Sequence, residues 1–81
     1  MKNYTFELAR TSTSKYLLAV FVNGEYAHYQ TYKMSPYFER KIRETLYMFK
    51  CKGELKIPAK IEWDKLPKKD FLEAPACAAS A

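Results

Sequence analysis

The sequence predicts an α+β domain of two layers, in which a small antiparallel sheet packs on one helix in the order β-β-β-α-β. Three observations predict this class. Residues 3–10 and 15–32 have the alternation and the β-branched and aromatic content of strands. Residues 35–53 repeat apolar side chains at helical spacing. Residues 54–63 then alternate again, so one helix is expected to cover one face of a sheet.

The length and composition fit one small domain. The chain has 81 residues, of which 48% are hydrophobic, so it has room for one core and too much apolar surface for a disordered chain. We expect a compact domain over residues 1–73 and a flexible tail over 74–81. No apolar run approaches the roughly 18 residues of a membrane span. No export signal is recognised at the N-terminus, which predicts a cytoplasmic protein.

The hairpin is the most specific local prediction. Asn23-Gly24 lies between two strand-like runs and favours a type I′ turn. A two-residue loop then places Val22 opposite Glu25 and Val20 opposite Ala27. One face is predicted to carry the core residues Tyr16, Leu18, Val20, Val22, Ala27 and Tyr29. The other face is predicted to lie away from the helix and to carry Leu17, Ala19, Phe21, Tyr26, His28, Gln30 and Tyr32.

The helix is predicted to begin at Ser35-Pro36, because Ser suits the N-cap and Pro the first helical position. Gly53 is the expected stop. The apolar stripe consists of Phe38, Ile42, Thr45, Leu46 and Phe49.

Residues 54–63 are predicted to form a fourth strand with one wet face. The alternating apolar positions are Leu55, Ile57, Ala59, Ile61 and Trp63. Pro58 cannot donate to a ladder, so this strand is expected at an edge or a bulge.

The residues that catalysis or cofactor binding would need are not grouped along the chain. His28 is the single histidine, and two glycines cannot build a phosphate-binding loop. We therefore expect a protein that is not an enzyme and that holds no cofactor and no metal. Cys51 and Cys77 are expected as reduced thiols, with an intersubunit or regulatory disulfide as the alternative.

Two surfaces are candidates for partner binding. The first is the helix side opposite the apolar stripe, which carries Arg40, Arg43, Tyr47 and Lys50. The alternative is an ordinary solvated helix face paired with Glu39 and Glu44. The second surface is the sheet face with Tyr26, His28 and Tyr32. Its alternatives are a cover formed by Trp63, Phe71 and Leu72, or a homodimer contact.

The charge distribution is compatible with an acidic partner. The formal net charge is +5, and residues 35–53 hold five basic and two acidic residues. Such a balance permits binding to nucleic acid or to an acidic protein, and it also lies in the range that favours solubility alone.

With its Asn23-Gly24 hairpin, its Ser35-Pro36 helix start and no active-site motif, the chain resembles in general type the small accessory proteins that bacteriophages encode, including anti-CRISPR-type inhibitors. The resemblance covers size and style rather than a family motif. It implies action by occupying a surface on a larger host assembly.

The leading hypothesis is therefore a non-enzymatic binding module that regulates or inhibits a larger protein or nucleoprotein complex. The alternative is direct nucleic-acid binding through the basic helix face. A homodimer is also compatible with the sequence.

Overall fold

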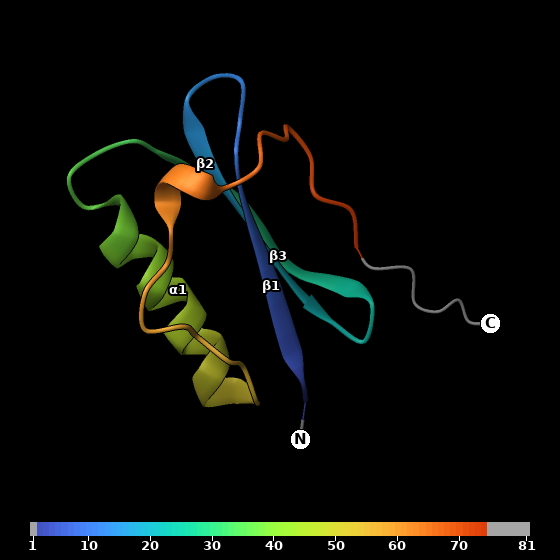
Figure 1. Cartoon of the computed structure of the whole chain (residues 1–81). Helices are drawn as coiled ribbons and strands as arrows, with labels where there is room; N and C mark the ends of the chain where they lie inside the picture. Colours follow the sequence, from blue (N-terminus) through green and yellow to red (C-terminus); the bar gives the residue numbers. More distant parts are fainter. Residues whose placement is uncertain (1, 75–81) are drawn as a thin grey trace.

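The computed structural model describes residues 2–74 and contains three strands, one α-helix and one short 3-10 helix (Figure 1). The strands are β1 (Tyr4–Arg10), β2 (Lys15–Val22) and β3 (Glu25–Lys33). The helices are α1 (Phe38–Lys52) and the 3-10 turn η1 (Trp63–Lys65). The expected α+β class, with an antiparallel sheet and one helix, is confirmed.

The β2–β3 hairpin turns at Asn23-Gly24, as predicted. Both residues have positive φ angles, 54° for Asn23 and 80° for Gly24, which is what a type I′ turn requires. Val22 lies opposite Glu25, and Phe21 lies opposite Tyr26, so the register next to the turn also agrees with the prediction.

Beyond Tyr26 the predicted register is wrong, because the register shifts by one residue between Val20 and Phe21. Val20 lies opposite His28 rather than Ala27, so Ala27 is the extra residue of a β-bulge. Side chains alternate with a period of two, so one extra residue moves every later side chain to the other face. His28, Gln30 and Tyr32 therefore lie on the helix side, and Tyr29 lies on the far side.

Helix α1 begins at Phe38, later than the predicted start at Ser35-Pro36. Tyr37 is the N-cap residue, and no side chain caps the helix. The Ser35 carbonyl accepts a hydrogen bond from the Phe38 amide, which closes a turn ahead of the helix. Ser35 and Pro36 therefore initiate a turn instead of occupying the cap and first helical positions.

The predicted helix stop at Gly53 is confirmed, but its cause is close packing. Gly53 has an extended backbone and donates its amide proton to the Phe49 carbonyl. A Cβ atom at Gly53 would lie 2.9 Å from Cε2 of Tyr4 and even closer to the Lys2 carbonyl oxygen. Only glycine leaves room for the N-terminal segment to pass the end of α1.

The predicted fourth strand over residues 54–63 is absent. A single bridge joins Asn3 to Glu54, and a second joins Arg10 to Lys68. Between the bridges, the chain passes along α1 without a ladder, with Pro58 unable to donate a hydrogen bond (Figure 1). The alternation predicted burial correctly at four positions, since Leu55 is buried and Ile57, Ile61 and Trp63 pack against the core. The prediction is wrong at Ala59, which is exposed.

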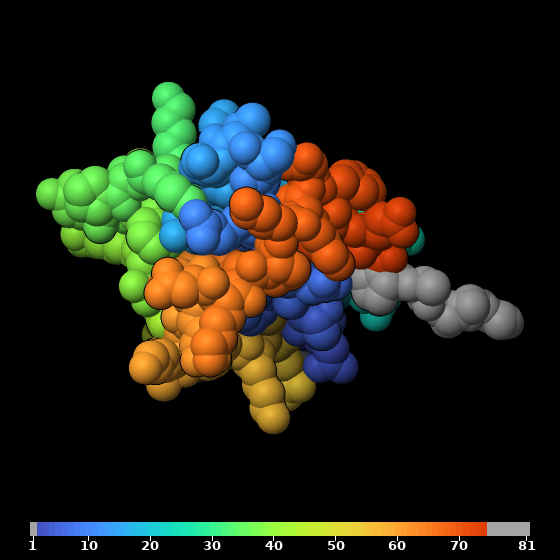
Figure 2. Space-filling view, turned by 45° about the horizontal axis from the view of Figure 1, so that its top comes forward, coloured from blue at the N-terminus to red at the C-terminus, as the bar shows by residue number. Residues whose placement is uncertain are grey.

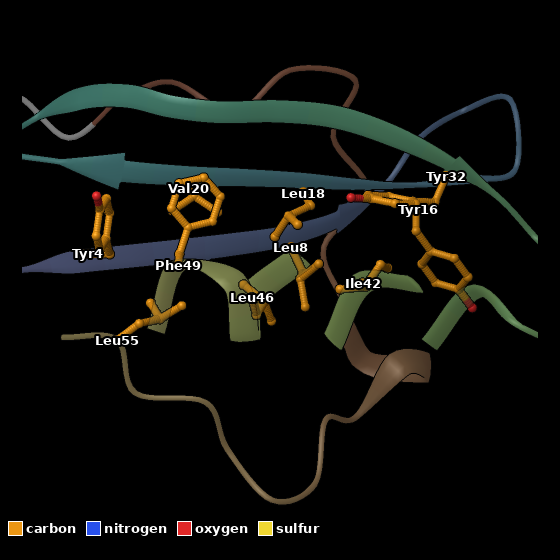
Figure 3. Close-up of a cluster of buried hydrophobic side chains, with 10 residues drawn as sticks. All are labelled: Tyr4, Leu8, Tyr16, Leu18, Val20, Tyr32, Ile42, Leu46, Phe49 and Leu55. Atoms are coloured by element: carbon orange, nitrogen blue, oxygen red, sulfur yellow. The ribbon is translucent and has the colours of Figure 1, made fainter. Parts of the chain in front are cut away.

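The sheet packs against other parts of the chain on both faces, although the far side of β3 stays exposed at Tyr29, Thr31 and Lys33. On the helix side, Leu8, Leu18 and Val20 pack against Ile42 and Leu46 of α1 (Figure 3). On the far side, the smaller cluster consists of Ala9, Leu17, Ala19, Phe21 and Leu72. Leu72 comes from the segment after η1, so the C-terminal part of the described chain folds back over the far face.

The two edges of the sheet differ. The outer edge of β1 is bonded at both ends, where Tyr4 and Arg10 donate amide protons to the carbonyls of Glu54 and Pro67. No backbone hydrogen bond within residues 2–74 reaches the outer edge of β3. The outer edge of β1 is therefore bonded at its two ends only, and the outer edge of β3 is open.

Candidate functional site

Three of the four predicted helix residues line one groove on the outside of α1. We call the helix groove the shallow hollow of about 760 Å³ between α1 and the passing chain. It is lined by Pro36, Glu39, Arg40, Arg43, Glu44, Tyr47 and Ile57. Tyr47 is 60% exposed and is the one aromatic side chain that lines the groove.

Arg43 does not offer a free charge, because all of its nitrogens have partners in the chain. Its Nε donates to Glu39 Oε2 at 3.0 Å. Its Nη1 and Nη2 donate to the carbonyl oxygens of Pro58 and Ala59 at 3.2 and 3.1 Å. Arg43 therefore ties the chain after α1 to the helix.

Arg40 is paired more loosely. Its Nε lies 3.5 Å from Glu44 Oε2, and both side chains are mostly exposed. Exposed i,i+4 pairs are weak, so Arg40 can exchange its partner at little cost. With Glu39 and Arg43 also on the rim, the helix groove carries two positive and two negative charges.

Lys50 lies apart from the helix groove. It lines a second hollow at the C-terminal end of α1, together with Asn3, Tyr4, Glu54 and Lys56. The four predicted helix residues are thus divided between two sites.

The predicted sheet residues are not brought together, because the bulge separates them. Tyr32 is 7% exposed, and its hydroxyl lies 3.1 Å from the Thr45 hydroxyl on α1. His28 packs beside Phe49 with ring centroids 5.8 Å apart, and its Nε2 has no hydrogen-bond partner within the described residues. Only Tyr26, at 44% exposure, lies on the far face as predicted.

An aromatic cluster forms on the far face. The alternative of a cover by Trp63, Phe71 and Leu72 is confirmed for Phe71 and Leu72, whereas Trp63 packs on the helix side. The ring centroids of Tyr26 and Tyr29 are 5.4 Å apart, and those of Tyr29 and Phe71 are 5.7 Å apart. Phe71 is 56% exposed. We call Tyr26, Tyr29 and Phe71 the aromatic ledge. Tyr26 and Tyr29 are three positions apart, so in a regular strand their side chains would lie on opposite faces. The bulge brings both rings to one face, and nothing in the sequence predicts that bulge.

The segment 70–74 is held on the far face by side-chain hydrogen bonds. The Tyr26 hydroxyl donates to the Leu72 carbonyl at 2.7 Å, and Tyr29 accepts from the Leu72 amide at 3.1 Å. Asp70 accepts from the Ser12 amide at 2.7 Å and from its hydroxyl at 3.2 Å. The backbone hydrogen bond from Ser12, with its side-chain bond second, lowers the pKa of Asp70.

The described part of the chain offers no metal centre. No group of three or more His, Cys, Asp or Glu side chains gathers there. Cys51 is an exposed free thiol at the end of α1. Cys77 and most of the expected tail lie outside the described residues, but Ala74 donates its amide proton to the Tyr26 hydroxyl.

Comparison with family models, with curated proteins and with solved structures finds no match. Within residues 2–74, α1 is too short and too polar to cross a membrane.

Proposed function

We propose that this chain is a non-enzymatic binding module that regulates or inhibits a larger protein or nucleoprotein complex, and that it contacts the protein component through the helix groove. The observation that carries the proposal is the exposed ring of Tyr47 between charged groups of both signs. Tyrosine offers a large and fairly rigid contact at a modest entropy cost, which is why it is common among interface anchors.

The charge balance of the helix groove favours a protein partner over a nucleic acid. Arg40 lies beside Glu44, and Arg43 beside Glu39, so a phosphate backbone approaching the groove would meet two carboxylates. A protein surface with mixed charges can instead exchange its own ion pairs with Arg40 and Glu44 and gain orientation from them. The regulatory or inhibitory role is supported by the resemblance in type to phage accessory proteins.

The experiment is capture of partners from the native host, followed by affinity measurement with the purified partner. We expect Tyr47→Ala to weaken binding by more than about 2 kcal/mol, the usual threshold of a hot spot. Arg40→Glu should weaken binding as well, because it places a third carboxylate on the rim beside Glu39 and Glu44.

The matched control is Tyr37→Ala, since Tyr37 is 64% exposed and does not line the groove. Equal affinity of the Tyr47 variant and the wild type would refute this docking site. Binding to bare DNA or RNA that falls in Lys50→Gln would favour the alternative of a nucleic-acid-binding helix.

A further inference from the structure

The fold gathers basic residues from four separate parts of the sequence at one end of the sheet. Arg10 ends β1, Lys15 begins β2 and Lys33 ends β3. Lys68 and Lys69 join them, because Lys68 bridges to Arg10 and the Lys69 amide donates to the Arg10 carbonyl. Figure 2 shows the orange-red segment beside the blue turn between β1 and β2.

These five residues form no ion pair within the described chain. The ion pairs there involve only Arg40, Arg43 and Lys65. The nearby acid Asp70 is bonded to Ser12 instead. Much of the positive charge that is free to meet a partner therefore lies at this end of the sheet, away from the helix groove.

Lys15 and Lys33 lie directly opposite each other on β2 and β3. Like charges at directly opposed positions destabilise a strand pair. Their neighbours Tyr16 and Tyr32 face the helix, so both lysines face the far side. An anion bound on the far face would relieve this repulsion.

The aromatic ledge lies on the same far face, along the same strand. From Tyr29 to Lys33 is four residues, or roughly 13 Å along β3. The ledge is held in place before any ligand arrives, because both tyrosine hydroxyls are bonded to Leu72. Phe71, at 56% exposure, leaves much of its ring surface to solvent.

We propose that the far face along β3 binds single-stranded nucleic acid, with bases stacked on Phe71 and Tyr29 and phosphates near Lys33 and Lys15. Aromatic rings followed by basic side chains on an open strand suit splayed bases and a backbone that runs along the sheet. A duplex hides its base faces and would use only the lysines. This site shares no residue with the helix groove. It extends the proposed function to the nucleic-acid part of a nucleoprotein, and its test is independent of the test of the helix groove.

The test is fluorescence anisotropy of the full chain with a labelled 12-nucleotide single strand of uridine or thymidine, measured over a salt series. We expect Phe71→Ala to weaken binding roughly 5- to 150-fold with an unchanged salt slope, since stacking is lost. Lys33→Gln should reduce the log–log salt slope by about 0.7, the value of one phosphate contact on a single strand.

Lys60→Gln is the matched control, because it removes the same charge from an exposed position between Pro58 and η1. Lys60→Gln should change the affinity and the salt slope less than Lys33→Gln does. Three results would overturn the proposal: no binding at about 50 mM salt, equal losses in the Lys33 and Lys60 variants, or a duplex bound as tightly as the single strand. Thermal unfolding of each variant shows that the fold is retained. If Phe71→Ala unfolds, Phe71→Leu, which keeps an apolar side chain but has no ring, repeats the stacking test and should weaken binding in the same direction.

Discussion

The hydroxyl of Tyr26 donates a hydrogen bond of 2.7 Å to the carbonyl of Leu72, 46 positions along the chain. The same oxygen accepts the amide proton of Ala74 at 3.2 Å. One exposed tyrosine thus serves two backbone groups of a segment that has no ladder of its own. Segment 70–74 is therefore held on the far face by hydrogen bonds to and from side chains.

Tyr26→Phe keeps the ring and removes both hydrogen bonds. We expect a loss of about 1–3 kcal/mol in the free energy of unfolding, at roughly 0.5–1.5 kcal/mol for each bond. Urea unfolding measures it. Tyr47→Phe is the control, since its hydroxyl has no partner in residues 2–74; an equal loss there would contradict the assignment.

Leu72 and Phe71 are neighbours with opposite environments. Leu72 is 2% exposed in the far-face cluster, and Phe71 is 56% exposed. Leu72→Ala should cost about 2–5 kcal/mol through cavity formation, whereas Phe71→Ala should cost about 0.5–1.5 kcal/mol, because it loses exposed ring contacts with Tyr26 and Tyr29. Comparing the midpoints of chemical unfolding tests this contrast, and similar midpoints would refute the far-face packing.

Asp70 predicts an acid-sensitive contact. Its pKa is lowered in the folded chain by the hydrogen bonds from Ser12. The stabilisation is therefore present above the unfolded pKa, near 4, and is lost as the pH falls through the lower folded value. In Asp70→Asn, stability should depend less on pH below about 4. Unfolding measured between pH 2 and 7 checks this, and parallel curves for variant and wild type would contradict it.

Arg43 and Arg40 should respond differently to the same substitution. Arg43→Lys keeps the charge but loses the fork that binds the Pro58 and Ala59 carbonyls, and we expect a cost of about 1–3 kcal/mol. Arg40→Lys should cost less than about 0.5 kcal/mol, since its pair is exposed. Thermal unfolding distinguishes them; equal effects would show that the carbonyl contacts contribute little.

Deletion of Ala27 should be tolerated. It removes the extra residue and leaves a regular hairpin in which Phe21 still meets Tyr26 and Val20 still meets His28. Cross-strand NOEs between Val20 and His28 should persist. Their loss, with Tyr32 becoming exposed, would mean that the bulge itself holds the register.

Part of this fold follows from local chemistry that the sequence displays. Asn23-Gly24 specifies its turn because both residues tolerate positive φ, and the spacing of Ile42, Leu46 and Phe49 specifies a buried helix stripe. Residues 26–32 mix aromatic and polar side chains at both parities. The hydrophobic pattern therefore does not distinguish a regular strand from a bulged one, and only the bulged strand brings Tyr32 to its buried position against α1.

The fourth strand was mispredicted for a related reason. Alternation reports which side chains are buried, and Leu55 and Ile57 are indeed turned toward the core. It does not report whether a neighbouring strand is present to accept a ladder. Of the candidate site, the exposed positions Arg40 and Tyr47 could be predicted from helical spacing, whereas the aromatic ledge depended on the bulge and on long-range contacts.

The open edge at β3 and the partly bonded edge at β1 limit any strand-by-strand assembly. Two copies meeting along β3 would leave only their β1 sides outward, and each of those is already bonded by its own chain at both ends. The bonds at both ends of β1 leave a shorter free edge there than on β3. A domain built this way favours a pair over open-ended fibre formation, although neither margin of its sheet carries a fourth strand.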